Sequence, residues 1–178
     1  MRRLKQETLG QHESLEQHLQ LLRQEMSLQD YRNLLEKLYG FYASWEQRAA
    51  PFLDRVLPGF FSDRRKTPLL VRDLLYLGSE PAALRECPNL PATDSLLPLL
   101  GSLYVLEGAT LGGQILTRHF VRQFNLSSHQ GCSFFAGYGV DTGCRWRDFC
   151  KLLISHSSPE HDTVIVQSAI QTFCCFGS

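Results

Sequence analysis

The sequence lacks an excess of charge of either sign and lacks a long uncharged run. Its 178 residues include 18 Lys plus Arg and 18 Asp plus Glu, so the formal net charge is zero. A neutral chain has no broad field that attracts nucleic acid or an anionic membrane. The uncharged run at residues 95–106 is too short to span a bilayer, and no apolar stretch of the secretory type follows the basic residues near Met1. We therefore expect a cytoplasmic protein without a nucleic-acid or membrane partner.

Cysteine motifs for metal binding are also missing. The six cysteines form no CxxC pairs and have no regular spacing with histidine. We expect them to be reduced and mostly buried, as small apolar residues. They are Cys87, Cys132, Cys144, Cys150, Cys174 and Cys175.

Alternating β-branched runs are nearly absent, and helical periodicity dominates. Leucines at i, i+4 and i+7 predict a first amphipathic helix over about residues 4–24. Ser27, with Asp30 three positions later, predicts the N-cap of a second helix. A third, short helix follows Pro68, and a long fourth helix, bent near its glycines, is expected to reach about Asn125.

Two further helices are expected after a glycine-rich loop, one over residues 145–154 and one from Pro159 nearly to the end of the chain. There is no internal repeat, low-complexity tract or linker. The sequence therefore predicts one all-α domain over residues 1–178, with about six or seven helices.

Three glycines interrupt the apolar stretch YVLEGATLGGQIL: Gly108, Gly112 and Gly113. Each interior glycine costs a helix roughly 1 kcal/mol relative to alanine. Gly101, Gly108 and Gly112 lie at i, i+7 and i+11 and mark a strip without side chains, with Gly113 beside it. The strip fits either close packing against another helix or a flat ligand lying against bare backbone.

His12 shares one face of the first helix with the leucines, so we expect it to point inward. It is either a core histidine bonded to a polar neighbour or a metal ligand. Glu16, at i+4, could accept a hydrogen bond from one ring nitrogen while the other faces a metal. Lys5 lies seven residues earlier, about 10 Å along a continuous helix, and could reach the anionic edge of a metal-bearing ligand.

Three segments in this order resemble heme oxygenase, specifically the bacterial group associated with bacteriophytochromes: QHESLE around His12, LGSLYVLEGATLGGQIL, and FFAGYG with TGCRWRDFC. The resemblance covers essentially the whole chain. It implies a single-domain helical bundle in which heme lies between the first helix and a kinked, glycine-rich distal helix.

The resemblance also implies roles for individual residues. His12 matches the proximal ligand of the heme iron, and Glu16 matches the glutamate one turn later. Gly108, Gly112 and Gly113 match the distal glycines, and Gln114 follows them as in the family. Lys5 matches a residue that pairs with a heme propionate. Arg147 and Lys151 match a basic pair at the same edge, although a solvated helix face explains them equally well.

The chain departs from the family pattern at two positions. Many heme oxygenases have an aspartate after the first distal glycine, where this chain has Ala109, and a tyrosine where this chain has Leu103. Thr110, Tyr104 or a residue of another helix is then expected to supply the polar groups near bound oxygen.

The implied activity is oxidative ring opening of heme b to biliverdin, with release of carbon monoxide and ferrous iron. Heme is both substrate and cofactor, and O2 is consumed. An electron-donor protein such as a ferredoxin or reductase is an expected partner, and a bacteriophytochrome is the expected consumer of the biliverdin. One alternative is a heme-binding or heme-trafficking protein that has lost turnover. Another is a thiaminase-like helical protein with a cysteine nucleophile.

Overall fold

The chain forms a helical bundle. The computed structural model describes residues 1–19, 22 and 26–176, without the side chains of residues 16, 18 and 19. Within this part of the chain there is no β-strand, only two isolated bridges near Ser127. The helices are α1 (Arg2–Glu7), α2 (Leu9–Leu19), α3 (Leu28–Val56), η1 (Ser62–Arg64), α4 (Thr67–Tyr76), η2 (Pro81–Ala83), α5 (Leu96–Phe124), α6 (Ser133–Ala136), η3 (Gly139–Asp141), α7 (Thr142–Ser155) and α8 (Pro159–Phe176).

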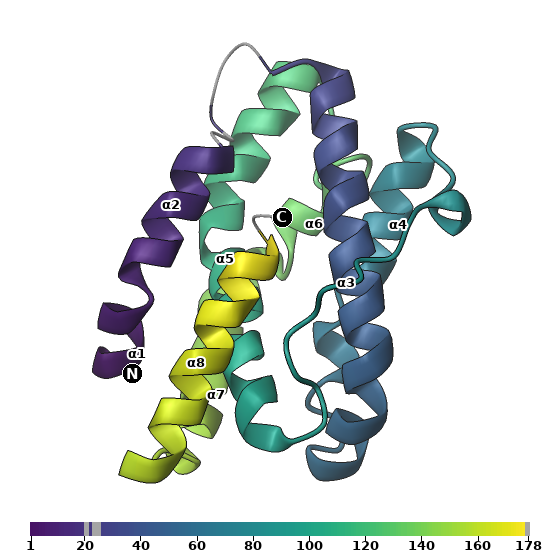
Figure 1. Ribbon diagram of the computed structural model, residues 1–178. Helices are drawn as coiled ribbons and strands as arrows, with labels where there is room; N and C mark the ends of the chain where they lie inside the picture. The colour runs from purple at the N-terminus through teal and green to yellow at the C-terminus, as the bar shows by residue number, and fades with distance from the viewer. Residues whose placement is uncertain (20–21, 23–25, 177–178) are drawn as a thin grey trace.

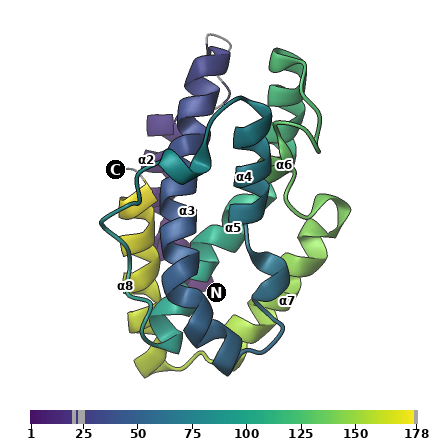
Figure 2. The ribbon, with the colours of Figure 1, turned by 90° about the vertical axis from the view of Figure 1, so that its right-hand side faces the viewer.

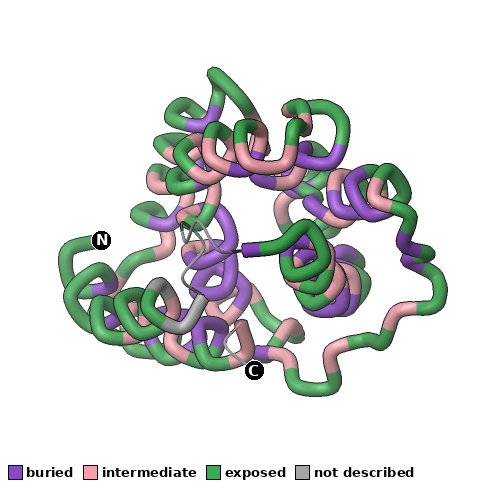
Figure 3. The backbone as a smooth tube through the Cα atoms, turned by 90° about the horizontal axis from the view of Figure 1, so that it is seen from above, coloured by how far each residue is buried: buried purple, intermediate pink, exposed green. Residues whose placement is uncertain are grey.

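Helix α5 is the centre of the bundle. It packs most extensively against α8 and also contacts α3, α6 and α7. Figures 1 and 2 show α2 and α8 on one side of α5 and the pair α3 and α4 on the other. Buried residues lie mostly on the helix surfaces that face one another (Figure 3), which gives one continuous core. The prediction of an all-α fold is confirmed.

Local signals place most helix ends as expected. Ser27 accepts a hydrogen bond from the backbone nitrogen of Asp30, whose carboxylate accepts one from the backbone nitrogen of Ser27, so the predicted capping box begins α3. Gly78 follows α4 with a φ of 78°, and Asn125 ends α5 in the left-handed region. The path of α5 bends in Figure 1.

The predicted first helix is not continuous. It is divided at Thr8, whose hydroxyl donates to the carbonyl of Leu4 at 2.8 Å, and α2 begins at Leu9. A hydroxyl that competes for backbone carbonyls can interrupt a helix in this way. The predicted end near residue 24 lies outside the described residues. Since α1 and α2 are separate, the axial spacing expected between Lys5 and His12 does not apply.

The prediction that the cysteines are mostly buried is wrong. None of the six, which all lie in the described part of the chain, forms a disulfide. Only Cys132 is buried, whereas Cys144 and Cys174 are exposed. Cys132 is the N-cap residue of α6, and burial raises the pKa of its thiol to about 11.

Helix α5 is long and apolar enough to cross a membrane by length and composition alone. Half of its most apolar window is buried inside the structure. Because other helices cover these residues, the apolar composition of α5 is explained by its position in the core.

Asp73 joins α4 to α6. The Asp73 side chain is fully buried and accepts hydrogen bonds from the backbone nitrogens of Ser133 and Phe134, both at 2.8 Å. Burial nevertheless raises the pKa of its carboxyl group. The two bonds fix the start of a four-residue helix that would otherwise have little support.

We predict that Asp73→Ala lowers the free energy of unfolding by about 2–4 kcal/mol, because two buried amide groups lose their acceptors. Asp73→Asn keeps one acceptor oxygen, so its free energy of unfolding should lie between those of the parent chain and of Asp73→Ala. Urea denaturation followed by circular dichroism measures both. Equal midpoints for the alanine variant and the parent chain would contradict this account of α6.

Candidate functional site

A cavity of about 670 Å³ lies between α2 and α5. This volume is typical of sites that bind small molecules or cofactors. The lining comes from α2, α3, α5, α6 and α8, together with the residue that precedes α4. The apolar side chains of the lining include Leu15, Leu34, Leu38, Leu106, Leu116, Phe134, Phe135 and Phe176.

His12 lines the cavity from α2. Its side chain is exposed, and its ring meets Phe173 edge-on with centroids 6.0 Å apart. A core histidine, the alternative left open by the sequence, is therefore excluded. His12 faces a space that can hold a ligand, while its role as an iron ligand stays a prediction. The side chain of Glu16 lies outside the described residues, so its predicted contact with His12 is untested.

The α5 glycines divide into two groups. A Cβ atom at Gly101 would collide with the carbonyl oxygen of Ile165 on α8, and one at Gly113 would collide with the carbonyl oxygen of Phe135 on α6. A Cβ at Gly112 would meet nothing within 4 Å, and one at Gly108 would make ordinary contact with Trp146. Close helix packing thus explains Gly101 and Gly113, but it does not explain Gly112, which lines the cavity together with Gly108.

The polar residues predicted near the glycines have different surroundings. Thr110 lines the cavity, and its hydroxyl donates to the carbonyl of Glu107 at 2.6 Å. Ala109 also lines the cavity. Tyr104 does not, because its ring packs beside Trp146 of α7 with centroids 5.8 Å apart. Gln114 donates to the carbonyls of Ala136 and Gly139, both at 3.2 Å, and so ties α5 to the loop that follows α6.

The three predicted propionate partners lie outside the cavity lining. Lys5, Arg147 and Lys151 are all exposed. Lys151 forms an ion pair with Asp148 at 3.2 Å. The cavity lining does not bring these three residues together, and their roles stay predictions.

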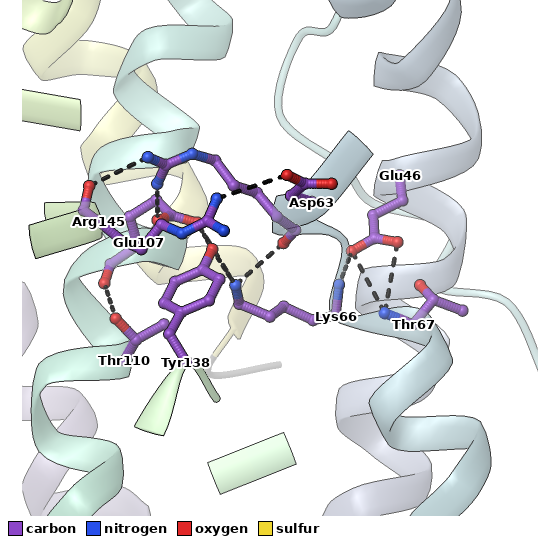
Figure 4. Close-up of polar contacts among 9 residues, drawn as sticks. Glu46, Asp63, Lys66, Thr67, Glu107, Thr110, Tyr138 and Arg145 are labelled. Carbon is purple, nitrogen blue, oxygen red and sulfur yellow. Dashed lines mark hydrogen bonds and ion pairs between the residues drawn. The ribbon is translucent and has the colours of Figure 1, made fainter. Parts of the chain in front are cut away.

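A buried ionic network surrounds Glu107, the residue before Gly108 (Figure 4). The Glu107 carboxylate is paired with Arg64, accepts a hydrogen bond from the Tyr138 hydroxyl at 2.7 Å, and lies 3.5 Å from Nζ of Lys66. Arg64 also donates to the carbonyl of Arg145 at 3.1 Å. These contacts connect the middle of α5 to η1, to Lys66 before α4 and to α7, and thereby restrain the helix next to Gly108.

Lys66 lines the cavity from within this network. Its ammonium group donates to the carbonyl of Arg64 at 3.0 Å and to the hydroxyl of Tyr138. Burial lowers the pKa of Lys66 to about 8, although Glu107 and Glu46 act in the opposite direction. Desolvation therefore outweighs the neighbouring carboxylates.

Sequence reasoning missed this network, although one signal was available. Glu107 is the only Asp, Glu, Lys, Arg or His in the mainly apolar run from residue 95 to residue 117. A carboxylate on such a helix needs buried positive partners, and the basic segment Asp63-Arg64-Arg65-Lys66 could have supplied them. Only the packing of η1 against α5 identifies which of those side chains do so.

No three His, Cys, Asp or Glu side chains within residues 1–19, 22 and 26–176 are placed to hold a metal ion together. His12 is the one histidine of the described cavity lining.

We predict opposite effects of alanine at two neighbouring positions. Gly112→Ala should keep or raise the free energy of unfolding by up to about 1 kcal/mol, because alanine favours a helix and the added methyl meets open space. Gly113→Ala should lower it by about 1–3 kcal/mol, because the methyl overlaps the Phe135 carbonyl. Urea titration of the two variants measures this difference. Equal destabilisation of both would contradict the assignment of Gly113 to close packing and of Gly112 to open space.

We predict a pH-dependent role of Lys66 in stability. Between pH 8 and the ordinary value of 10.5, the unfolded chain holds the Lys66 proton more tightly than the folded chain does. The contribution of this group to the free energy of unfolding therefore rises with pH. The free energy of unfolding of the parent chain minus that of Lys66→Met should increase by about 2 kcal/mol from pH 7 to pH 9.5. If this difference stays constant or falls over the range, folding does not lower the pKa of Lys66 and the prediction is wrong.

Comparisons with known proteins agree with this architecture. The sequence model of the family described as Heme oxygenase matches residues 1–178. A curated protein with the name Heme oxygenase from Xanthomonas campestris pv. campestris (strain 8004) is 30% identical over 88 residues, which are 49% of this chain and 51% of that protein. The match thus spans about half of the length of that relative.

Solved structures match over 98% of this chain. Crystal structures of the NO- and CO-bound heme oxygenase from Neisseria meningitidis give a TM-score of 0.82 at 22% identity and 86% coverage of that chain. Heme oxygenase from Leptospira interrogans gives 0.80 at 19% identity and 94% coverage. Heme oxygenase-1 from the cyanobacterium Synechocystis sp. PCC6803, in complex with heme, gives 0.76 at 19% identity and 87% coverage. With the fold and the family model matched over the full sequence, the chain belongs to the heme oxygenase family.

Proposed function

We propose that this chain is a heme oxygenase that converts heme b to biliverdin, carbon monoxide and ferrous iron, with O2 and an external electron donor. The observation that carries the proposal is the position of His12 on α2 and of Gly108 and Gly112 on α5 around a single cavity. The family match supports the reaction class, and a relative of the same fold was crystallised with heme.

The residues present fit a heme. The lining is mainly apolar, as suits the face of a macrocycle, and His12 offers an imidazole nitrogen of the kind that binds heme iron. The open space at Gly112, where even a methyl group would meet nothing within 4 Å, leaves the α5 backbone accessible to a flat ring. Access of a ligand to the backbone would explain why the helix has a glycine at position 112, which lowers helix stability and packs against no neighbouring helix.

When bound, heme would supply a redox-active iron that activates dioxygen for reaction with a carbon of the same ring. The contribution of the chain is to hold and orient the ring. His12 on α2 would hold the iron, and the backbone of α5 at Gly108 and Gly112 would contact the ring. The Glu107 network keeps this part of α5 in place, since Arg64 and Tyr138 hold the residue next to Gly108 from two other segments.

One observation favours a second candidate, a heme-binding or heme-trafficking protein without turnover. No carboxylate is present among the described cavity-lining residues, and Ala109 occupies the position where many relatives have an aspartate. The hydroxyl of Thr110 remains available as an acceptor, because its own hydrogen bond is donated to Glu107. The alternative of a thiaminase-like protein with a cysteine nucleophile has no support, since the described lining contains no cysteine.

The proposal extends to the cellular setting. The chain would act in the cytoplasm, receive electrons from a ferredoxin or a reductase, and supply biliverdin to a bacteriophytochrome. The support for the last partner is the sequence resemblance to the phytochrome-associated group.

We predict that added hemin gives an intense Soret band and that His12→Ala loses or strongly shifts it, because the iron loses its imidazole ligand. With reductant and oxygen, the parent chain should yield a bile pigment identified by chromatography. His129→Ala is the matched control, because His129 is exposed on a loop and is not part of the described cavity lining.

The outcomes separate the candidates. Hemin binding through His12 without ring opening under any electron donor would favour the heme-binding alternative. Hemin spectra that are identical in the parent chain and His12→Ala would remove the basis of both candidates.

A further inference from the structure

The described lining of the cavity is almost free of charged groups. It contains no carboxylate, and Lys66 is its one lysine or arginine. His12 belongs to α2, whereas Lys66 precedes α4. Figures 1 and 2 show α2 on one side of α5 and α4 on the other. The cavity therefore has an imidazole on one side and an ammonium group on the other.

Hydrogen bonds fix the Lys66 ammonium group close to α5. The Lys66 side chain is only 4% exposed, and its Nζ donates to the carbonyl of Arg64 at 3.0 Å and to the hydroxyl of Tyr138. The Glu107 carboxylate lies 3.5 Å from Nζ, which is beyond the usual hydrogen-bond distance. An ammonium group has three N–H donors, so one of them is not held at an ordinary hydrogen-bond distance by these partners.

The carboxylates near Lys66 lie outside the described lining. The Glu107 side chain is 2% exposed, and its oxygens bind Arg64 and the Tyr138 hydroxyl. Glu46, on α3, accepts a hydrogen bond from the backbone nitrogen of Lys66 at 2.5 Å (Figure 4). Of these groups only Lys66 lines the cavity. A ligand in the cavity would therefore contact the cation and neither of its counter-ions.

The surroundings strengthen the effect of this charge. The lining is mainly apolar, and the Coulomb energy at a given distance rises as the effective dielectric constant falls. The partners of the ammonium group come from η1 and from the residue that precedes η3, so the group is in place before a ligand binds. A positive group that is already in place stabilises negative charge without a cost of reorganisation.

We propose that Lys66 is the polar group that acts on a small ligand of the heme iron, on the side of the ring opposite His12. Its positive charge stabilises negative charge on the ligand atom that points away from the iron. The inference rests on the proposed function and deepens it, because it names the residue that supplies electrostatic stabilisation in a lining without a carboxylate. It also gives the ionic network around Glu107 a second role besides the support of α5.

Carbon monoxide on ferrous heme and azide on ferric heme are the probes. A positive charge beside bound carbon monoxide draws electron density into its antibonding orbitals and lowers the C–O stretching frequency. We expect Lys66→Met to raise this frequency, measured by infrared spectroscopy at pH 7, and Lys66→Arg to restore it towards the value of the parent chain. Azide, an anion, should bind Lys66→Met about tenfold more weakly. Lys37→Met removes an exposed lysine of α3 outside the described lining and should change neither property.

Glu107→Gln separates the charge of Lys66 from its packing. This substitution removes a counter-ion, so it should lower the C–O stretching frequency, in the opposite direction to Lys66→Met. A shift of both variants in the same direction would show that displacement of α5 causes the change, and it would overturn the proposal. If Glu107→Gln does not fold, Lys66→Arg decides in its place, because an arginine variant that behaves as the methionine variant does also overturns the proposal.

The proposed function has a separate test, the Soret band of bound hemin and its loss in His12→Ala. Equal stretching frequencies and equal azide affinities in the parent chain and Lys66→Met would reject the role of Lys66. If the parent chain binds hemin through His12 in that case, the function stands and only this inference falls. A parent chain that does not bind hemin rejects both.

Discussion

The closeness of α5 to its neighbours at two glycines is the constraint on which the site depends. At Gly101 the backbone of α8 comes so near that no side chain fits, and at Gly113 the backbone of α6 does the same. These contacts are twelve residues apart, or about 18 Å along the helix. Between them, Gly112 has open space in front of it. Because α5 is fixed at both contacts, the stretch between them can border a cavity without collapsing into it.

The buried charges around Glu107 add a restraint within the same stretch. Two cations, Arg64 and Lys66, and the Tyr138 hydroxyl converge on one carboxylate that is 2% exposed. Burying such groups costs free energy, and the lowered pKa of Lys66 reflects this cost. What the network provides is placement, since it joins three segments distant in sequence at the residue before Gly108. Ala109, which lines the cavity, follows Gly108 directly and adds no polar group.

The cavity is asymmetric in its ionic groups. Its described lining is mainly apolar, and Lys66 is held by its network partners. A flat, largely apolar ligand with charged groups on one edge matches this distribution. The heme oxygenase family, to which the chain belongs, acts on a molecule of this shape.

Local sequence signals predicted much of the helical framework. The capping box at Ser27, the glycine after α4 and the periodic leucines act over a few residues, so they are legible without a structure. The break at Thr8 was not predicted, although the bond from its hydroxyl to the Leu4 carbonyl is local. The exposure of Cys144 and Cys174 was not predicted because burial depends on neighbours from other helices.

The candidate site divides in the same way. The sequence by itself determined that the chain is helical, that His12 and the α5 glycines belong together, and which family they resemble. Only the tertiary structure decided that Gly113 serves packing whereas Gly112 faces open space, that Glu107 is neutralised by Arg64, and that the predicted anchors Lys5, Arg147 and Lys151 lie outside the cavity lining. The physical reason is range: caps and periodicity are local, while contact, burial and cavity shape arise between segments that lie far apart in the chain.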